Sequence, residues 1–464
     1  MRHRWTFVRE DGRRTVDRPT ALDLAFLDLE TPQAPLHVGF TLRFTGRAPS
    51  PAALRRHLDA RLGGGPVWAD DPGFDIAHHV FAVTLRGELR AVAGRLLSTP
   101  LPADRPLWRM YLVDGLPGEE FAIVGQAHHA LIDGVAAIQV AQLLFGPASD
   151  APGATWTPAP PPTGAATLRA TAATGGRALA SLARSATPER ATALLRDAAR
   201  AAEALAAATP SGSALERSLT ARRVVAYAEA PLEGVRAAGR ARGATINDVF
   251  LTATAIALRG ALRRRGERRE TLRALVPVSV RAGDDAALGN RIAFLPVALP
   301  VGEPDPHRAL TLVAARTAAA KAGGDAGALD ALARGADALP GAARRLVARG
   351  AARALPFTLV VSNVPGPPVA LSLLGRELRS VHPMVPLLHG HALTVGAVSY
   401  DGRLNVGVAA DAEVVPDAVD LARDLEAAFD ALRAAPAAGA AGPAVSPWRA
   451  RAQARRTGQR AAKR

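Results

Sequence analysis

The sequence predicts an α/β protein built as two lobes. Strand patterns interspersed with helix patterns occur in both halves of the chain, and a segment rich in Ala, Pro and Arg separates them. The chain has 464 residues, whereas single hydrophobic cores stop growing at roughly 250–300 residues. We therefore expect a first lobe at 1–150, a helical linker at 151–221, a second lobe at 222–434 and a low-complexity basic tail at 435–464.

The first lobe has its clearest pattern between residues 121 and 145. Residues 121–127 are mostly apolar and predict a buried strand, which His128 and His129 close. A short connection follows, and Asp133 with Gly134 begins a helix predicted at 135–145. A helix start suits Asp133, because its carboxylate can accept backbone N–H groups there.

The second half contains several predicted strands and a terminal helix. The last two strands flank Asp401-Gly402, the strongest short signal for a hairpin. The helix at about 416–433 places apolar side chains on one face. Within the linker, Thr187-Pro188 predicts the start of a helix that packs on its own protein or on a membrane surface. The strands are expected at 272–280, 292–301, 358–362, 392–400 and 403–409.

Composition and charge exclude several classes of protein. The absence of cysteine excludes disulfides, thiolate nucleophiles and Cys-ligated zinc. The net charge is +15, but seven basic residues lie in the last 17 residues without an acidic one. No zinc-finger or RNA-binding signature accompanies this charge, so nucleic acid is not the expected partner. Without a signal peptide or a long apolar run, we expect a cytoplasmic protein, with peripheral contact to a membrane or lipid droplet left open.

The histidine pair at residues 128 and 129 is the candidate reactive site. The ends of strands are where α/β proteins expose reactive groups to a crevice. A histidine at such a place can take a proton from a hydroxyl, since its unperturbed pKa is near neutrality. From these residues alone, ordinary core or turn histidines remain an equal alternative.

Two other histidine clusters test how specific this interpretation is. His78-His79 is also a pair, but no Asp-Gly and no helix start follow it, and we expect it on the face of a strand. His389-Gly390-His391 could place two imidazoles on one strand face. No carboxylate completes a ligand set there, so no metal site is expected.

Several segments of the sequence resemble those of a known family. Residues 128–134 match the HHxxxDG signature of the CoA-dependent acyltransferase superfamily. Further segments narrow the resemblance to bacterial wax ester synthase/diacylglycerol acyltransferases, and they run in order from about residue 20 to 430. These segments are Leu22-Asp23, Glu30-Thr31-Pro32, His37-Val38-Gly39, Pro106-Leu107-Trp108, Asn247-Asp248, Gly289-Asn290-Arg291, Ser362-Asn363-Val364-Pro365-Gly366-Pro367, Ser399-Tyr400-Asp401-Gly402 and Asp411.

The resemblance implies a fold, an activity and roles for residues. It implies two chloramphenicol-acetyltransferase-like lobes with an active-site channel between them. His129 would be the general base beside His128 and Gly134, and Asp133 would hold the loop by pairing with a cation, with Arg291 as one candidate. Asn247 would lie near the reacting centre with Asp248 bracing its helix. Ser362 and Asn363 would line the channel, supported by Pro106 and Trp108. Acyl-CoA would be a co-substrate, with no cofactor and no metal.

The implied activity is transfer of a long-chain acyl group from acyl-CoA to diacylglycerol or to a fatty alcohol. A condensation-type enzyme using a carrier-protein thioester, and a non-catalytic lipid-binding protein, are the alternatives. Individual motifs also have structural interpretations: Trp108 as a core aromatic, Pro106 as a turn former, and Asn247-Asp248 as a helix cap. The sequence departs from the family at Arg109, where an acidic residue is common, and at Thr252, where alanine is usual.

Overall fold

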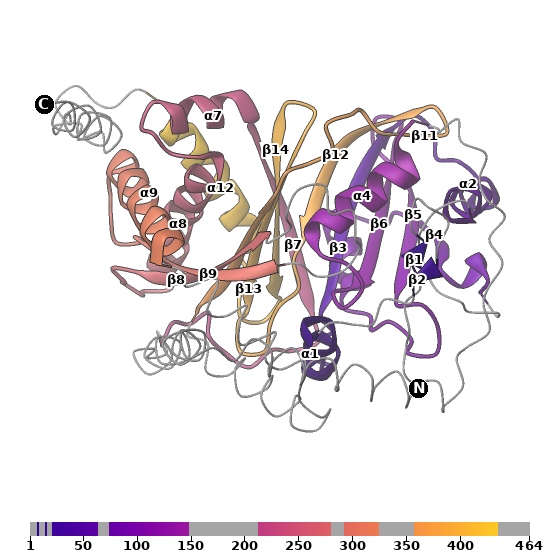
Figure 1. The fold of residues 1–464 in the computed structure, drawn as a ribbon, viewed down its shortest axis with the longest axis horizontal. Coiled ribbons are helices and arrows are strands. Elements are labelled where there is room, and N and C mark those ends of the chain that lie inside the picture. Colours follow the sequence, from indigo (N-terminus) through magenta and orange to yellow (C-terminus); the bar gives the residue numbers. More distant parts are fainter. Residues whose placement is uncertain are drawn as a thin grey trace, which may run out of the picture.

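The protein folds into two α/β lobes that stand side by side (Figure 1). The computed structural model describes residues 7–8, 14–15, 21–63, 74–147, 212–279, 292–323 and 357–434. Each lobe contains one six-stranded sheet, and a small two-stranded sheet, β1 (Phe7–Val8) with β2 (Arg14–Thr15), lies near the N-terminus. The predicted fold class, α/β with two lobes, is confirmed.

The first lobe has helices on both faces of its sheet. One face packs against α2 (Pro51–Gly63) and α4 (Gly134–Phe145) around Phe44 and Phe121. The other face packs against α3 (Leu89–Leu97) around Val92. α1 (Ala21–Leu29) precedes the sheet. The strands, in spatial order, are β11 (Ser372–Leu373), β12 (Arg376–Met384), β3 (His37–Thr45), β6 (Glu120–His128), β5 (Trp108–Leu116) and β4 (Val80–Thr84).

Two strands of the first sheet come from the second half of the chain. β12 pairs antiparallel with β3, with Val381 opposite Leu42, and β11 pairs with β12. Figure 1 shows β12, drawn in orange, beside the violet strand β3. The expected division into lobes at 1–150 and 222–434 is therefore wrong for residues 372–384, which cross from the second lobe into the first. This crossing ties the two lobes together.

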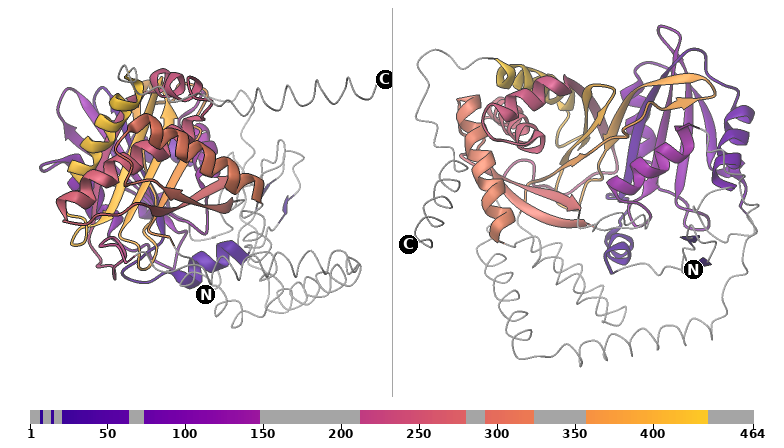
Figure 2. Two further views of the ribbon diagram at one scale, coloured as in Figure 1. Left: turned by 90° about the vertical axis from the view of Figure 1, so that its left-hand side faces the viewer. Right: turned by 45° about the horizontal axis from the view of Figure 1, so that its top comes forward.

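The second lobe has a mixed sheet. Its outer helices are α7 (Leu232–Arg240), α8 (Ile246–Arg264), α9 (Pro306–Gly323) and α12 (Ala418–Arg433). Figure 2 shows them at the end of the molecule remote from the first lobe. The strands, in spatial order, are β7 (Arg223–Pro231), β14 (Arg403–Asp411), β13 (Leu393–Tyr400), β10 (Leu359–Val364), β8 (Leu272–Ser279) and β9 (Ile292–Leu299).

The local predictions for this half are largely confirmed. All five expected strands are present within one to two residues of their expected ends. β13 and β14 form the expected hairpin, and Asp401 (φ 44°) and Gly402 (φ 69°) have the two positive φ angles of a type I′ turn. The apolar face of α12 is buried as its spacing predicted. None of the helices within the described ranges is long and apolar enough to cross a membrane.

The expected position of His78-His79 on a strand face is wrong, and His389-Gly390-His391 does not form the strand face that it could have formed. His78 ends a single 3₁₀ turn (Ile76–His78), and His79 follows it just before β4, so neither lies on a strand face. His389-Gly390-His391 forms a turn in which Gly390 has a φ of 86°. In both places a tight turn comes just before a strand, and alternation of side chains cannot indicate this. The predicted linker helix, the basic tail and Arg291 lie outside the described residues.

Candidate active site

A cavity of about 460 Å³ lies between the lobes and is lined from both. This volume is in the range of pockets that hold small ligands, which are mostly apolar with a few polar groups. We call it the central cavity. On the first-lobe side it runs between the sheet (Val38, Phe40, Met110) and α4 and reaches Leu58 of α2. On the second-lobe side it meets β8, β9, β10 and α9.

Helix α4 forms one wall of the central cavity. Its sequence has no charged residue, and it turns Ile138, Ala141 and Leu144 toward the space. A helix that is apolar nearly all round must be buried. Here one part of its surface packs on the sheet and another bounds the cavity: Ile138 and Ala141 are only half-buried, whereas Leu144 is buried.

His129 lies where the central cavity meets the end of β6. Its backbone N–H donates to the carbonyl of Leu36 at 2.9 Å. Its imidazole stacks on the Phe26 ring with the centroids 4.2 Å apart. The ring is only partly buried and lines the cavity. A substrate in this space would therefore reach the imidazole, as the sequence argument requires.

His128 is fully buried and lies outside the cavity lining. The Ala130 N–H donates to His128 Nδ1 at 3.0 Å, which leaves the proton of the neutral ring on Nε2. That nitrogen lies 3.6 Å from Oε2 of Glu30. The two adjacent histidines thus face different surroundings, and His128 is placed to hold the loop rather than to meet a substrate.

Glu30 bridges two buried histidines. Its other carboxylate oxygen, Oε1, lies 3.6 Å from Nε2 of His37, which is opposite His128 on the neighbouring strand. Burial alone would raise the pKa of Glu30, but hydrogen bonds and charge attraction from His128 and His37 outweigh it and lower the pKa to about 2. Burial lowers the pKa of His37, and Glu30 partly opposes that change. The carboxylate is therefore ionised at neutral pH.

Asp133 is the N-cap of α4, as predicted. Its Oδ1 accepts the Ala136 N–H at 2.8 Å, and the residue is 1% exposed. It also borders the central cavity. Its expected cation, Arg291, lies outside the described residues.

The surroundings of Gly134 explain why the HHxxxDG motif ends in a glycine. A Cβ added there would lie 2.5 Å from Cγ2 of Val364, in the second lobe. Any side chain at 134 would therefore push β10 away from the start of α4. The absence of a side chain allows the two lobes to approach closely beside His129.

Asn247 and Asp248 have separate functions. Asp248 forms a capping box with Thr245 and accepts the Thr317 hydroxyl at 2.7 Å, which joins α8 to α9. It is a structural brace, as expected. Asn247, one residue earlier, lines the central cavity. Thr252, which departs from the family, is buried and donates its hydroxyl to the Asp248 carbonyl at 2.7 Å.

Ser362 and Asn363 line the cavity from the second lobe. They lie on β10, directly opposite Gly396 and Ala397 of β13. The following residue is Val364, the contact of Gly134. The Ser-Asn-Val-Pro-Gly-Pro segment therefore supplies both polar groups to the cavity and the contact that closes the lobes beside His129.

Trp108 is both a core aromatic and a wall of the cavity. It is 6% exposed, and its ring stacks on His79 with centroids 4.5 Å apart. Pro106 is buried and forms the turn before β5, where the Trp108 N–H donates to its carbonyl at 2.9 Å. The guanidinium carbon of Arg109 lies 5.6 Å from the centroid of the Phe81 ring, a cation–π contact.

The structure thus brings most of the expected site together. His129, Asp133, Gly134, Trp108, Asn247, Ser362 and Asn363 border one cavity, whereas His128, Pro106 and Asp248 lie behind it. Phe26, Glu30 and His37 carry no role that the sequence predicted, although Glu30 and His37 lie in family segments. The spacing of Glu30 and His37 along the sequence did not predict their contact, because the contact forms only when α1 meets the sheet. Among the described residues, no group of three His, Asp or Glu side chains could hold a metal ion.

Family models and relatives agree with this site. Residues 43–250 match the wax ester synthase/diacylglycerol acyltransferase catalytic domain, and residues 288–433 match the C-terminal domain of the same proteins. The chain belongs to the wax ester synthase/diacylglycerol acyltransferase family. It is therefore an O-acyltransferase. The catalytic-domain match contains every expected site residue except Ser362 and Asn363, which fall in the second match.

Relatives of this acyltransferase cover nearly the whole chain. It is 31% identical over 442 residues to a probable diacylglycerol O-acyltransferase, tgs1, of Mycobacterium tuberculosis, covering 88% of this chain and 94% of that one. A putative diacylglycerol O-acyltransferase of the same organism is 32% identical over 447 residues, with 88% of each chain covered.

Solved structures show the same architecture. The wax ester synthase/diacylglycerol acyltransferase from Marinobacter aquaeolei VT8 superposes with a TM-score of 0.63 at 25% identity, covering 89% of this chain and 97% of that one. The first condensation domain of the calcium-dependent antibiotic synthetase superposes with a TM-score of 0.54 at 18% identity, covering 89% and 93%. The second likeness concerns the fold alone.

Proposed function

We propose that this enzyme transfers a long-chain acyl group from acyl-CoA to the hydroxyl of diacylglycerol or of a fatty alcohol, with His129 as general base. The observation that carries the proposal is the imidazole of His129, which opens into an apolar cavity lined by both lobes. The names of the relatives support diacylglycerol as acceptor, and the name of the Marinobacter enzyme supports both acceptors.

In the proposed reaction, acyl-CoA and the alcohol occupy the central cavity together. His129 takes the hydroxyl proton while the alcohol oxygen attacks the thioester carbonyl carbon. The tetrahedral oxyanion accepts hydrogen bonds from donors such as the side chains of Asn247, Ser362 and Asn363. The C–S bond then breaks, and the imidazolium returns the proton to the CoA thiolate. The products are the ester and free CoA.

The two sides of the central cavity suit different parts of the substrates. The side below α4 is walled by Leu58, Leu144 and Phe145, which suits an alkyl chain. The second-lobe side includes Thr317 and Lys321 beside its apolar strands. A cation near the end of α9 is compatible with the anionic part of CoA.

We also propose that the protein meets its acceptor at a lipid surface, because diacylglycerol partitions into membranes and droplets. Sedimentation with vesicles containing dioleoylglycerol tests this. Protein that stays in the supernatant with such vesicles, yet esterifies dispersed acceptor, would contradict it.

The test of the function is CoA release with palmitoyl-CoA against hexadecanol and dipalmitoylglycerol, with identification of the product. We expect an ester from at least one acceptor and none with His129→Ala. Turnover that requires palmitoyl-carrier protein in place of palmitoyl-CoA would favour a condensation-type enzyme. No release with any acceptor from folded protein would reject the proposal.

A further inference from the structure

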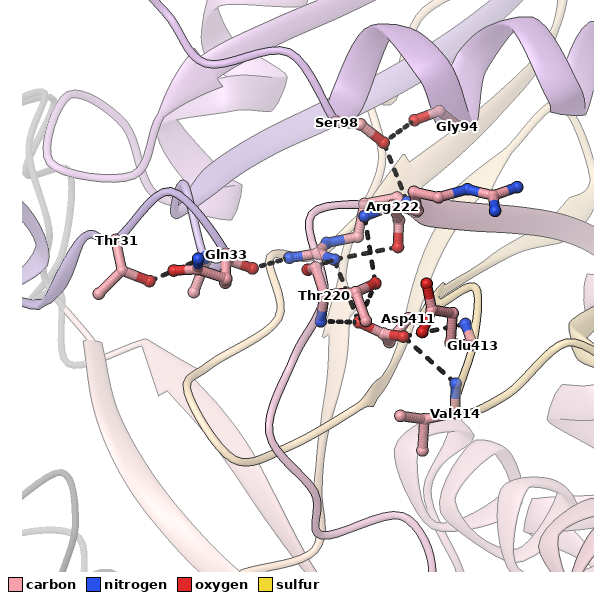
Figure 3. A network of polar contacts seen from close by, with 11 residues as sticks. Thr31, Gln33, Gly94, Ser98, Thr220, Arg222, Asp411, Glu413 and Val414 are labelled. Atoms are coloured by element: carbon pink, nitrogen blue, oxygen red, sulfur yellow. Dashed lines mark hydrogen bonds and ion pairs between the residues drawn. The ribbon is translucent and has the colours of Figure 1, made fainter.

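A partly buried polar network joins the two lobes near the start of β7, between the segments of Gln33, Ser98, Thr220 and Asp411 (Figure 3). The Arg223 side chain is 6% exposed. Its Nη1 donates to the Thr220 carbonyl at 2.8 Å and lies 3.5 Å from Oδ2 of Asp411. Its Nη2 donates to the carbonyl of Gln33, in the first lobe. One guanidinium therefore contacts both lobes.

Asp411 anchors Arg223 on the side of the second lobe. The carboxylate is fully buried. One oxygen accepts the Thr220 N–H at 2.6 Å and the Thr220 hydroxyl at 3.0 Å. The other accepts the backbone N–H groups of Glu413 at 3.0 Å and Val414 at 3.2 Å. With four donors besides Arg223, this anion has a fixed position at the end of β14.

The backbone of Arg223 is attached to the first lobe as well. Its N–H donates to the Ser98 hydroxyl at 2.9 Å, which in turn donates to the Gly94 carbonyl at 2.7 Å. A Cβ added at Gly94 would lie 2.7 Å from the Arg223 carbonyl oxygen. The end of α3 thus packs directly on the start of β7.

The segment that Arg223 holds through Gln33 leads to His129. Thr31 and Ala34 close it with two backbone hydrogen bonds of 3.1 and 2.9 Å, so residues 31–34 form one tight turn. Just before the turn, Glu30 bridges His37 and His128. Just after it, the carbonyl of Leu36 accepts the N–H of His129. A shift of this turn would therefore move His128, through Glu30, and His129, through the Leu36 carbonyl.

We propose that Arg223 is a positioning residue for acyl transfer: it holds the turn at residues 31–34 against the second lobe and so sets the place of His129 in the central cavity. The inference rests on the proposed role of His129. The reacting groups come together in a cavity lined by both lobes, so the relative position of the lobes sets their alignment. A misplacement of about 1 Å can cost ~10²-fold in rate.

The test uses Arg223→Lys in the full chain. Lysine keeps the charge beside Asp411, but its single ammonium cannot reach the Thr220 and Gln33 carbonyls as the planar guanidinium does. We expect kcat to fall about tenfold while KM for palmitoyl-CoA changes less than about twofold. A purely structural role would lower the melting temperature and leave kcat of the folded enzyme unchanged, and that result would overturn the proposal.

A matched control is Arg265→Lys. Arg265 forms an ion pair with Asp417, and both residues belong to the second lobe. We expect this variant to keep the wild-type kcat, and an equal loss in both variants would count against a specific role of Arg223.

If Arg223→Lys does not fold, Arg223→Gln takes its place with the same expectation. His129→Ala is assayed in parallel. If it stays active, the base assignment fails; if it is inactive while Arg223→Lys is normal, only this inference fails.

Discussion

Two pairs of adjacent histidines in the first lobe have opposite surroundings. His78-His79 precedes β4, which is the edge strand of its sheet. His79 is buried, stacks on Trp108 and donates from Nδ1 to the Trp108 carbonyl at 2.9 Å. His128-His129 follows the interior strand β6, and His129 faces the central cavity. The dipeptide alone therefore predicts nothing about chemistry; the strand that it ends and the surface that it meets decide its role.

The largest expected difference between the pairs is in turnover. His129→Ala should lower kcat by about 10²–10⁴-fold, because the general base is lost, with little loss of stability since the ring is only partly buried. His79→Ala should show the reverse pattern and cost about 2–3 kcal/mol in unfolding free energy. Steady-state CoA release and urea unfolding measure the two effects.

The exposed His78 provides the control for this comparison. His78→Ala should match the wild type in both assays. The comparison between the pairs breaks down if His79→Ala loses as much turnover per folded molecule as His129→Ala does.

The second prediction concerns the close approach of Gly134 to Val364, which follows His129 in the chain and has no counterpart after His79. Gly134→Ala should lower kcat about 10-fold or more, because its methyl group would meet Val364 and displace the second lobe. The double variant Gly134→Ala/Val364→Ala should recover most of the activity by making room. Failure of the second substitution to rescue the first would show that contact between these two residues is not the cause.

The third prediction concerns the wall of the central cavity that α4 forms. Ala141→Phe should fill the space below α4 and shift the preference toward shorter alkyl chains, with a roughly tenfold loss on C16 substrates. Varying acyl-CoA length at fixed alcohol, and alcohol length at fixed acyl-CoA, shows which chain occupies this side. An unchanged length profile in both series would place the chain elsewhere.

The smallest expected effect is on stability in acid. The pKa of Glu30 is lowered to about 2, mainly by His128 and His37 acting against burial. The ionised carboxylate therefore stabilises the fold above the unfolded pKa of about 4.3, and this stability is lost as the pH falls toward about 2. After allowance for the exposure of Glu30, we expect about 1 kcal/mol. Glu30→Gln should flatten the pH dependence of the melting temperature in that window, whereas Glu88→Gln, at an exposed helix end, should not.

The sequence predicted the features that depend on neighbours along the chain. The N-cap at Asp133 and the hairpin at Asp401-Gly402 both follow from local backbone geometry, which a few residues fix. The buried face of α12 follows from its spacing. The HHxxxDG segment likewise indicated the loop and its family, and the expected His129 lies in the cavity that the resemblance implied.

Only the tertiary structure decided the rest. β12 joins the first sheet with about 340 residues of chain between Val381 and Leu42, and no periodicity specifies which distant edge a strand will join. Glu30 acquires two imidazole partners because α1 meets β3 and β6, and Arg223 links the lobes because the ends of β7 and β14 meet the turn at residues 31–34. Local patterns fix the hydrogen bonds and the buried face of each element. Which elements pack together depends on the shape and charge of surfaces that exist only once the elements have formed.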